Sequence, residues 1–295
     1  MAGIPELRLC GTKMSDKSTD LAWEDWGRRD PYYGVITDPK FRRQDLTEEA
    51  KREFFASGQW HVNHVLHLIH RHIDPNFAPT NVLDFGCGVG RTLVHFATVA
   101  EHVVGVDVSQ AMLQEARRNC DEQGRPNVRL LLSDDALSLL AGDFDLIHSF
   151  IVFQHIPVER GRALVSRLLT FVRPGGVGAL HLTYAKRRFA DTYGVAPPET
   201  PVPVPSARKK HKKRAPNGAD VAKSSSPAAV TSDPEMQMNP YNLSEILFSL
   251  QCSQIQRFHA EFTDHGGELG VFLLFQKPVD SNERPPVPSP SDIKP

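Results

Sequence analysis

A glycine-rich turn between an apolar strand and a helix is the feature that most constrains the fold of this chain. Residues 81–91 read Asn-Val-Leu-Asp-Phe-Gly-Cys-Gly-Val-Gly-Arg, and residues 92–97 that follow are typical of a helix. A strand, a glycine turn and a helix N-terminus together hold nucleoside-containing cofactors in doubly wound sheets. The pattern therefore predicts an α/β fold with a cofactor site at this turn.

An acid just before the glycines indicates which cofactor the turn accepts. Asp84 ends the strand two residues before Gly86, and Arg91 departs from the glycine spacing of dinucleotide sites. A pyrophosphate favours backbone N–H groups without a nearby carboxylate, whereas S-adenosylmethionine carries an ammonium group and a cationic sulfur. The turn therefore favours S-adenosylmethionine over a nicotinamide dinucleotide. Alternatively, Asp84 caps the following turn and the glycines only make that turn tight.

A second apolar strand, residues 102–107, also ends in an acid. Asp107 lies about 20 residues beyond the glycine turn, a position from which a carboxylate accepts hydrogen bonds from ribose hydroxyls. Ser109 then occupies a helix N-cap position. Met112, one turn into that helix, could cover an adenine face or simply fill the core.

A series of short motifs occurs in a fixed order along residues 80–183. They span residues 84–90, 104–107, 133–136, 144–149 and 172–176. This order resembles the class I S-adenosylmethionine-dependent methyltransferases, nearest to the small-molecule branch that includes quinone-biosynthesis and sugar methyltransferases. The resemblance implies an α/β Rossmann-like fold with a mostly parallel seven-stranded sheet, helices on both faces, and S-adenosyl-L-methionine as methyl donor. It also extends to a helix and a closing hairpin within residues 241–277.

The resemblance also implies where the methyl donor lies. Ligands of doubly wound sheets bind beyond the carboxyl ends of the strands. The family places an acid that accepts from the adenine amino group at Asp134, with Asp135 as the register alternative, although both could instead cap a helix starting at Ala136. The predicted cofactor-binding residues are Asp84, Gly86, Cys87, Gly88, Gly90, Asp107, Val108, Met112, Asp134, Asp135, Ser149 and Phe150, the last two mainly through backbone atoms.

Gln154 and His155 follow the fourth predicted strand, and we expect them to face the reacting centre. Methyl transfer is an in-line displacement at an activated carbon, so the enzyme mainly holds the nucleophile close and aligned. A hydroxyl or protonated amine acceptor also requires a base, and histidine has a suitable pKa. His155 is therefore the candidate catalytic base. Alternatively, it makes a structural hydrogen bond that holds the loop before Pro157.

Contacts to the methyl acceptor must come from segments that cover the ends of the strands. The candidates are Tyr32, Tyr33, Gln154 and His265. The two tyrosines stand in a turn and could form a lid, because aromatic faces cover ligands and phenols form hydrogen bonds. Packing on the protein surface is the alternative for them.

A group of histidines, His61, His64, His67, His70 and His72, flanks an apolar helical stripe. Their spacing matches no common zinc motif, so we interpret them as a polar helix face and expect no metal site. The four cysteines lie far apart, which also disfavours zinc ligation and a disulfide framework.

Changes in composition divide the 295 residues into parts. We expect disorder over 1–20, a helical N-terminal cap over 21–79 with helices near 47–58 and 60–73, and the methyltransferase domain over 80–277. A proline- and serine-rich insertion at about 187–239 and a proline-rich tail at 278–295 are expected to be disordered.

The overall charge limits the partners that we expect. The net charge is −1, which gives no general attraction to nucleic acid or anionic lipid, and no segment is long and apolar enough to span a membrane. We expect a cytoplasmic protein with a small-molecule acceptor and without a nucleic-acid partner. The oligomeric state is not indicated. A basic run at 208–214 could touch nucleic acid, lipid or a localisation receptor, or be a solvated loop.

These observations predict a methyltransferase that transfers the methyl group of S-adenosylmethionine to a hydroxyl of a sugar or secondary metabolite. Two alternatives stay open. One is a non-catalytic, regulatory protein that binds S-adenosylmethionine. The other is an RNA or protein methyltransferase recruited by the basic run at 208–214.

Overall fold

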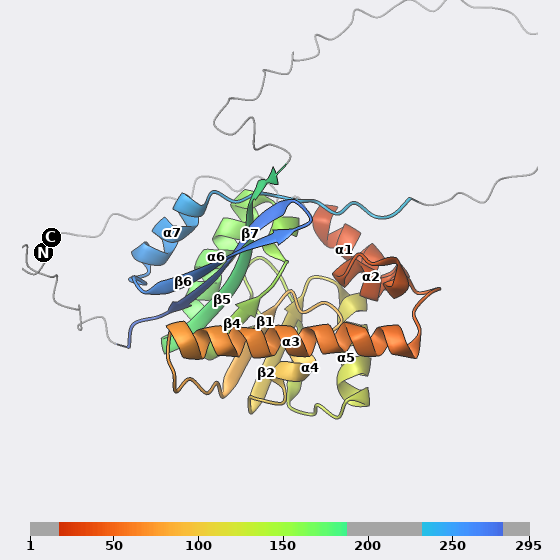
Figure 1. The fold of residues 1–295 in the computed structure, drawn as a ribbon, viewed down its shortest axis with the longest axis horizontal. Coiled ribbons are helices and arrows are strands. Elements are labelled where there is room, and N and C mark those ends of the chain that lie inside the picture. The colour runs from red at the N-terminus through yellow and green to blue at the C-terminus, as the bar shows by residue number, and fades with distance from the viewer. Residues whose placement is uncertain (1–17, 188–231, 280–295) are drawn as a thin grey trace, which may run out of the picture. The chain divides into compact units, whose positions relative to one another are not determined.

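The computed structural model describes residues 18–187 and 232–279, and these contain one seven-stranded sheet (Figure 1). The strands are β1 (Asn81–Phe85), β2 (His102–Asp107), β3 (Val128–Leu132), β4 (Phe144–Ser149), β5 (Val172–Lys186), β6 (Phe258–His265) and β7 (Glu268–Gln276). Their order is β3-β2-β1-β4-β5-β7-β6, with the first five parallel and β7 antiparallel to both neighbours. The predicted mixed sheet is confirmed. The basic run at 208–214 lies outside the described residues.

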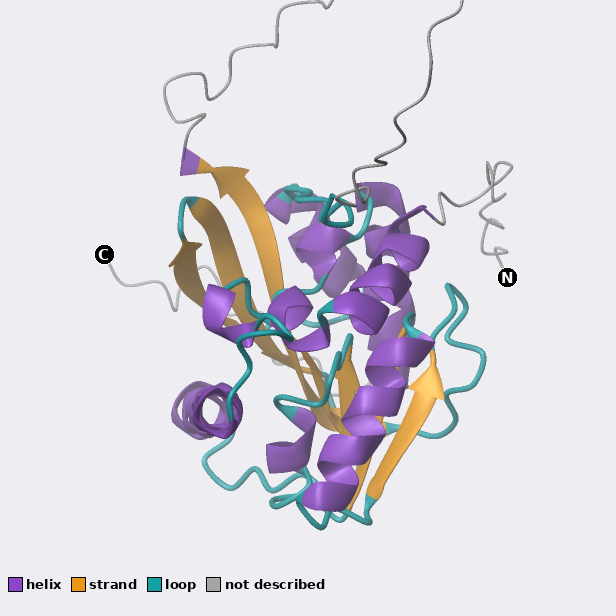
Figure 2. Cartoon of the chain, turned by 90° about the vertical axis from the view of Figure 1, so that its right-hand side faces the viewer, coloured by secondary structure: helices purple, strands orange, loops and turns teal. Residues whose placement is uncertain are grey.

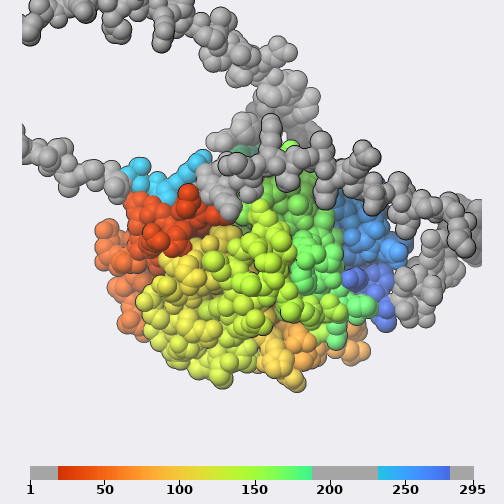
Figure 3. Space-filling view, turned by 180° about the vertical axis from the view of Figure 1, so that it is seen from behind, coloured from red at the N-terminus to blue at the C-terminus, as the bar shows by residue number. Residues whose placement is uncertain are grey.

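Helices cover both faces of the sheet (Figure 2). They are α1 (Ser18–Arg29), α2 (Pro31–Val35), α3 (Glu48–His72), α4 (Leu93–Phe96), α5 (Gln110–Glu122), α6 (Val158–Phe171) and α7 (Leu243–Cys252), with short 3₁₀ turns η1 (Pro39–Phe41) and η2 (Phe153–His155). Because successive strand residues point to opposite faces, Val82 packs with the helices α1–α5 and Leu83 packs with α6 and α7. The face that carries α6 and α7 is turned toward the viewer in Figure 3.

Residues 48–72 form one helix, α3, rather than the two helices that we predicted. Thr47 caps it, because its Oγ1 accepts a hydrogen bond from Ala50 N at 3.1 Å. Gly58, which we took as a helix end, instead lets α3 approach the loop after β1. A Cβ atom at Gly58 would lie 2.0 Å from the carbonyl oxygen of Arg91. The glycine therefore marks close packing of two segments and not a break in the helix.

Candidate functional site

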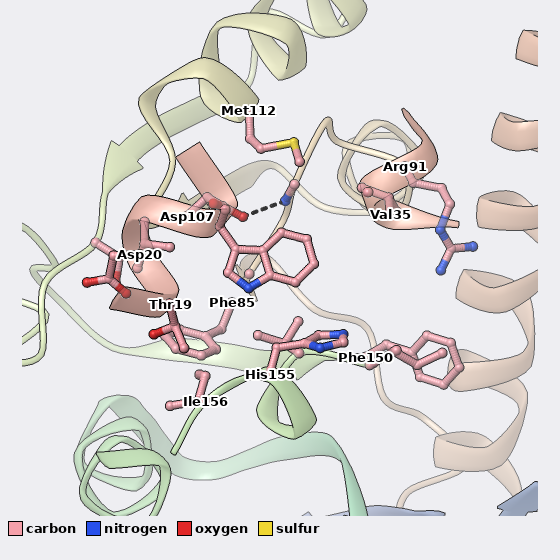
Figure 4. A pocket seen from close by; sticks show the side chains of 18 of the residues that line it. Thr19, Asp20, Val35, Phe85, Arg91, Asp107, Met112, Phe150, His155 and Ile156 are labelled. Carbon is pink, nitrogen blue, oxygen red and sulfur yellow. Dashed lines mark hydrogen bonds between the residues drawn. The ribbon is translucent and has the colours of Figure 1, made fainter. Parts of the chain in front are cut away.

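A cavity of about 400 Å³ lies beyond the carboxyl ends of β1, β2 and β4 (Figure 4). This is the edge at which doubly wound sheets bind their ligands. Phe85 and Asp107 are the last residues of β1 and β2, and Phe150 directly follows β4. The N-terminal helices contribute Trp23, Val35 and His61. The cavity is therefore enclosed between the sheet and the first helices of the chain.

The glycine turn and Asp107 form one end of the cavity. The N–H groups of Gly86 and Cys87 donate to the carbonyl oxygen of Val106 at 2.8 and 3.0 Å, which docks the turn on β2. Gly88 N donates to Asp107 Oδ2 at 2.9 Å, drawn as the dashed line in Figure 4, and Ser109 N donates to Oδ1 at 2.9 Å. The Asp107 carboxylate is thereby held at the cavity wall in one orientation.

Burial disfavours the charged form of Asp107 and raises the pKa of this carboxyl to about 6, despite the hydrogen bonds that favour the charged form. The N–H groups of Ser109 and Gly88 pull the pKa down, and the Asp84 carboxylate adds to the increase. A half-buried carboxylate with lone pairs toward a cavity is suited to accept hydrogen bonds from ligand hydroxyls.

The start of α5 continues this wall, as predicted. Ser109 caps the helix, because its Oγ accepts from Met112 N at 3.1 Å while donating to Glu24 Oε2 at 2.9 Å. Val108 and the buried Met112 line the cavity beside Asp107. An apolar surface next to a ribose-binding acid is suited to an adenine ring.

The predicted residues Asp84, Cys87 and Gly90 lie behind this wall and not on it. The Cys87 side chain is buried against β2, and burial raises the pKa of its thiol well above the ordinary value. The Asp84 carboxylate is buried as well, and it accepts from Thr92 Oγ1 and from His148 Nδ1, each at 2.7 Å. Our expectation that Asp84 faces the methyl donor is therefore wrong for its side chain, because internal partners occupy both oxygens.

Asp134 and Asp135 both line the cavity, and each already has a protein partner. Asp134 accepts from Ser138 N at 2.9 Å and from Ser138 Oγ, which lowers the pKa of its carboxyl. It caps a turn, because residues 136–140 form turns rather than the helix considered above. Asp135 accepts from Arg160 Nε at 2.7 Å, and Arg160 also pairs with Asp20 of α1 at 2.6 Å.

Gln154 and His155 occupy η2, but only His155 lines the cavity. Gln154 is buried, and its Oε1 accepts from Thr183 Oγ1 at 2.7 Å. His155 Nδ1 lies 2.8 Å from the carbonyl oxygen of Gln237, and His155 Nε2 lies 3.3 Å from Gln154 Nε2. Burial lowers the pKa of His155 to about 4. The geometry matches the structural alternative, since both ring nitrogens have protein partners.

The partner of His155 belongs to a segment that we had included in the insertion at 187–239. Besides the contact of Gln237, Asn239 N donates to the carbonyl oxygen of Gln154 at 2.6 Å. Residues 237–239 therefore hold η2 in place behind the cavity. Ser149 is buried away from the cavity, and its Oγ has no hydrogen-bond partner among the described residues.

The prediction that Tyr32 and Tyr33 form a lid is wrong, because α2 packs against α5. Tyr32 Oη is buried and lies 2.8 Å from Glu115 Oε1 and 2.8 Å from Asn119 Oδ1, and burial raises the pKa of this phenol. The Tyr33 ring lies 3.5 Å from the Arg42 guanidinium. Neither ring lines the cavity.

Comparisons with known proteins agree with the fold and the cofactor end. Residues 82–176 match the family model described as a methyltransferase domain. Ubiquinone biosynthesis O-methyltransferase of Thiobacillus denitrificans is 29% identical over 142 residues, covering 45% of this chain and 60% of that protein. The Aeromonas salmonicida protein of the same name is 28% identical over 144 residues, covering 45% and 59%. The chain thus spans about 60% of the length of the curated relatives that it matches.

Solved structures show the same fold. Magnesium protoporphyrin IX methyltransferase (ChlM) from Synechocystis PCC 6803 with bound SAH has a TM-score of 0.56 at 17% identity, covering 88% of this chain and 99% of that one. The DhpI-SAM-HEP complex has a TM-score of 0.51 at 16% identity, covering 89% and 99%. The matched residues 82–176 thus form a methyltransferase domain, within a fold that these solved structures share.

The other end of the cavity in this methyltransferase domain contains a histidine that sequence reasoning missed. His61 lies on the cavity wall, although we had assigned it to a polar helix face. Its Nε2 lies 2.9 Å from His148 Nε2, and its ring centroid lies 3.9 Å from that of Phe150, with the two rings tilted by 35°. The available signal was its spacing from Val62 and Val65, which places it at the border of the apolar stripe.

Phe150 and His265 complete this end of the methyltransferase domain's cavity. Their rings are 5.8 Å apart, and burial lowers the pKa of His265. Within the described residues, no cluster of histidine, cysteine and acidic side chains is arranged to hold a metal ion. None of the helices in the described ranges is long and apolar enough to cross a membrane.

Proposed function

We propose that this protein transfers the methyl group of S-adenosylmethionine to a hydroxyl of a small molecule. The observation that carries the proposal is the Asp107 carboxylate, held by Gly88 N and Ser109 N at the wall of a cavity that also contains Met112. A fixed acid beside a glycine turn is suited to ribose hydroxyls. The matches to O-methyltransferases of ubiquinone biosynthesis support an oxygen acceptor.

The cavity residues fit this methyl donor in a consistent order. We expect Asp107 to accept from the ribose hydroxyls, and Val108 and Met112 to cover the adenine. The turn at Gly86 approaches the ligand without a side chain. A Cβ atom there would lie 2.5 Å from the side chain of Val152, so the cradle tolerates only glycine.

The protein's part in the reaction is alignment more than chemical activation. S-adenosylmethionine supplies a methyl carbon that its positive sulfur already makes electrophilic. The walls formed by Trp23, Phe150 and His265 exclude water and hold an acceptor oxygen in line with that carbon. An acceptor hydroxyl also has to lose its proton, so the end of the cavity opposite Asp107 must offer a base.

The experiment that tests this proposal separates binding from turnover. Isothermal titration calorimetry of the full chain with S-adenosylmethionine and S-adenosylhomocysteine should give binding that Asp107→Ala weakens about 100-fold or more. Each hydrogen bond to a charged group contributes about 1.5–3 kcal/mol, and a ribose offers two hydroxyls. Asp143→Ala is the matched control, because Asp143 is an exposed acid before β4 and outside the cavity.

Mass spectrometry of reactions with catechol, caffeate and a hexose then detects product gaining one methyl group. Absence of binding, or equal binding by Asp107→Ala, contradicts the cofactor site. Binding without a methylated product from any of these acceptors favours the alternative, a protein that binds S-adenosylmethionine without turnover.

A further inference from the structure

A row of buried polar side chains connects the back of the glycine turn with the acceptor end of the cavity. Asp84 comes from β1, His148 from β4 and His61 from α3, and their exposed fractions are 2%, 1% and 4%. Asp84 Oδ1 lies 2.7 Å from His148 Nδ1, and His148 Nε2 lies 2.9 Å from His61 Nε2. Buried groups at these distances form a continuous hydrogen-bonded chain.

The hydrogen bonds in this chain determine which nitrogen of each ring carries the proton. The Asp84 carboxylate only accepts, so His148 Nδ1 donates to it and His148 Nε2 is left as an acceptor. His61 Nε2 must then donate to His148 Nε2, which leaves the lone pair on His61 Nδ1. Asp84 Oδ2 is already engaged by Thr92 Oγ1, which holds the carboxylate in place.

The free nitrogen of His61 faces the cavity. His61 is one of the residues that line it, and no described residue forms a hydrogen bond with Nδ1. This nitrogen is not fully buried, so it stays open to the cavity that His61 lines. It can therefore accept a hydrogen bond from a ligand.

We propose that Asp84, His148 and His61 form a relay in which His61 Nδ1 is the general base for the hydroxyl of the methyl acceptor. This inference rests on the proposed function and names the residue that its chemistry requires. As the new O–CH₃ bond forms, the C–S bond breaks and its electron pair stays on sulfur. The hydroxyl proton moves to His61 Nδ1, and the imidazolium donates through Nε2 to His148, which is held by the Asp84 carboxylate.

The surroundings of His61 keep its ring neutral before the reaction. The titratable and charged groups that act on it are His148, Arg91, His64 and His181. Burial is the main reason that the pKa of His61 lies far below its ordinary value, and the repulsion from these groups adds to it. A neutral ring has the lone pair that a base needs at pH 7, and Arg91 on the same wall stabilises negative charge on the acceptor oxygen.

Nuclear magnetic resonance of the full chain tests the relay without any acceptor. Long-range ¹H–¹⁵N correlations should show a proton on Nε2 of His61 and on Nδ1 of His148. A proton on His61 Nδ1 in the unchanged protein overturns the relay, whether or not methyl transfer is found.

Kinetics test whether the relay acts in catalysis. His61→Gln keeps an N–H toward His148 but has no lone pair at the Nδ1 position. We expect kcat for the acceptor identified among catechol, caffeate and the hexose to fall about 10²–10⁴-fold. The Kd of S-adenosylmethionine should stay within about twofold, as expected for a group that acts only in the transition state.

His67→Gln is the matched control, because His67 is exposed on the same helix. It should leave both constants unchanged. An unchanged kcat in His61→Gln overturns the role of His61 as base and leaves the proposed methyltransferase function intact. If the unchanged protein does not bind S-adenosylmethionine, the proposed function itself is contradicted.

Discussion

The two ends of the cavity are built in different ways. The cofactor end comes from Gly86, Gly88, Asp107 and Met112, which lie within one strand–turn–helix–strand–helix stretch and are connected by backbone hydrogen bonds. The acceptor end combines α3, the residue after β4 and the last residue of β6, which are far apart in the chain. A local motif therefore determines the methyl donor, whereas long-range packing determines the geometry around the acceptor.

We expect a substitution that disturbs the packing of α3 to have the largest effect on the acceptor end of the cavity. Gly58→Ala would place a Cβ atom 2.0 Å from the carbonyl oxygen of Arg91, so the helix that carries His61 must move. We expect the free energy of unfolding to fall by about 1–3 kcal/mol as overpacking outweighs the better helix propensity of alanine. Urea denaturation measures this change.

Gln59→Ala is the control for Gly58→Ala, because Gln59 is exposed on the same turn of α3 and its replacement should change stability by less than about 0.5 kcal/mol. Gly58→Ala should also lower kcat more than it weakens S-adenosylmethionine binding. Equal effects on both would show that the two ends of the cavity are not separable.

The cofactor end should instead respond to pH through Asp107. The raised pKa of about 6 means that this carboxyl takes up a proton at a higher pH than an ordinary aspartate. Only the ionised form accepts two hydrogen bonds, so affinity for S-adenosylmethionine should fall about tenfold, or about 1.4 kcal/mol, between pH 7 and pH 5. Calorimetry across this range measures it. In Asp107→Asn the dependence should be absent, and a dependence that persists there would assign it to another group.

The smallest expected effect compares the two histidines of the cavity. His155→Asn retains an N–H that can reach the Gln237 carbonyl, so we expect stability to fall by about 1 kcal/mol and kcat to change less than tenfold. Both ring nitrogens of His155 already have protein partners, so the ring offers no free lone pair to an acceptor hydroxyl. Measured beside His61→Gln, a larger loss of kcat in His155→Asn would reverse the roles proposed for these residues.

Much of the fold was predictable because its signals are local. Apolar runs that end in Asp84 and Asp107 identify β1 and β2, and the glycines between them adopt positive φ angles of 74°, 52° and 85° that favour glycine. Gly58 was misread because a glycine that breaks a helix and one that permits close packing look the same in a sequence. What distinguishes them is the neighbouring chain, here Arg91.

The residues of the site likewise divide into those that local sequence signals predicted and those that depend on tertiary contacts. Asp107, Val108 and Met112 were predictable from the end of a strand and the start of a helix. Tyr32 was assigned to the cavity, but its hydroxyl pairs with Glu115 and Asn119, a partnership that depends on how α2 lies on α5. His61 was passed over because five histidines on one helix look alike until one of them meets a buried partner.

The amino-acid sequence alone thus settles the class I fold and the location of the cofactor end. The backbone geometry of the glycine turn and the ends of the strands depend on residues that are neighbours in the chain. Which side chain faces the acceptor depends on contacts between α3 and β4, and on residues 237–239, which return from a distant part of the chain. Asp84 illustrates the difference. Its position before the glycines is a local signal, but whether its carboxylate faces a ligand or a histidine depends on which buried groups the folded chain brings within hydrogen-bonding distance.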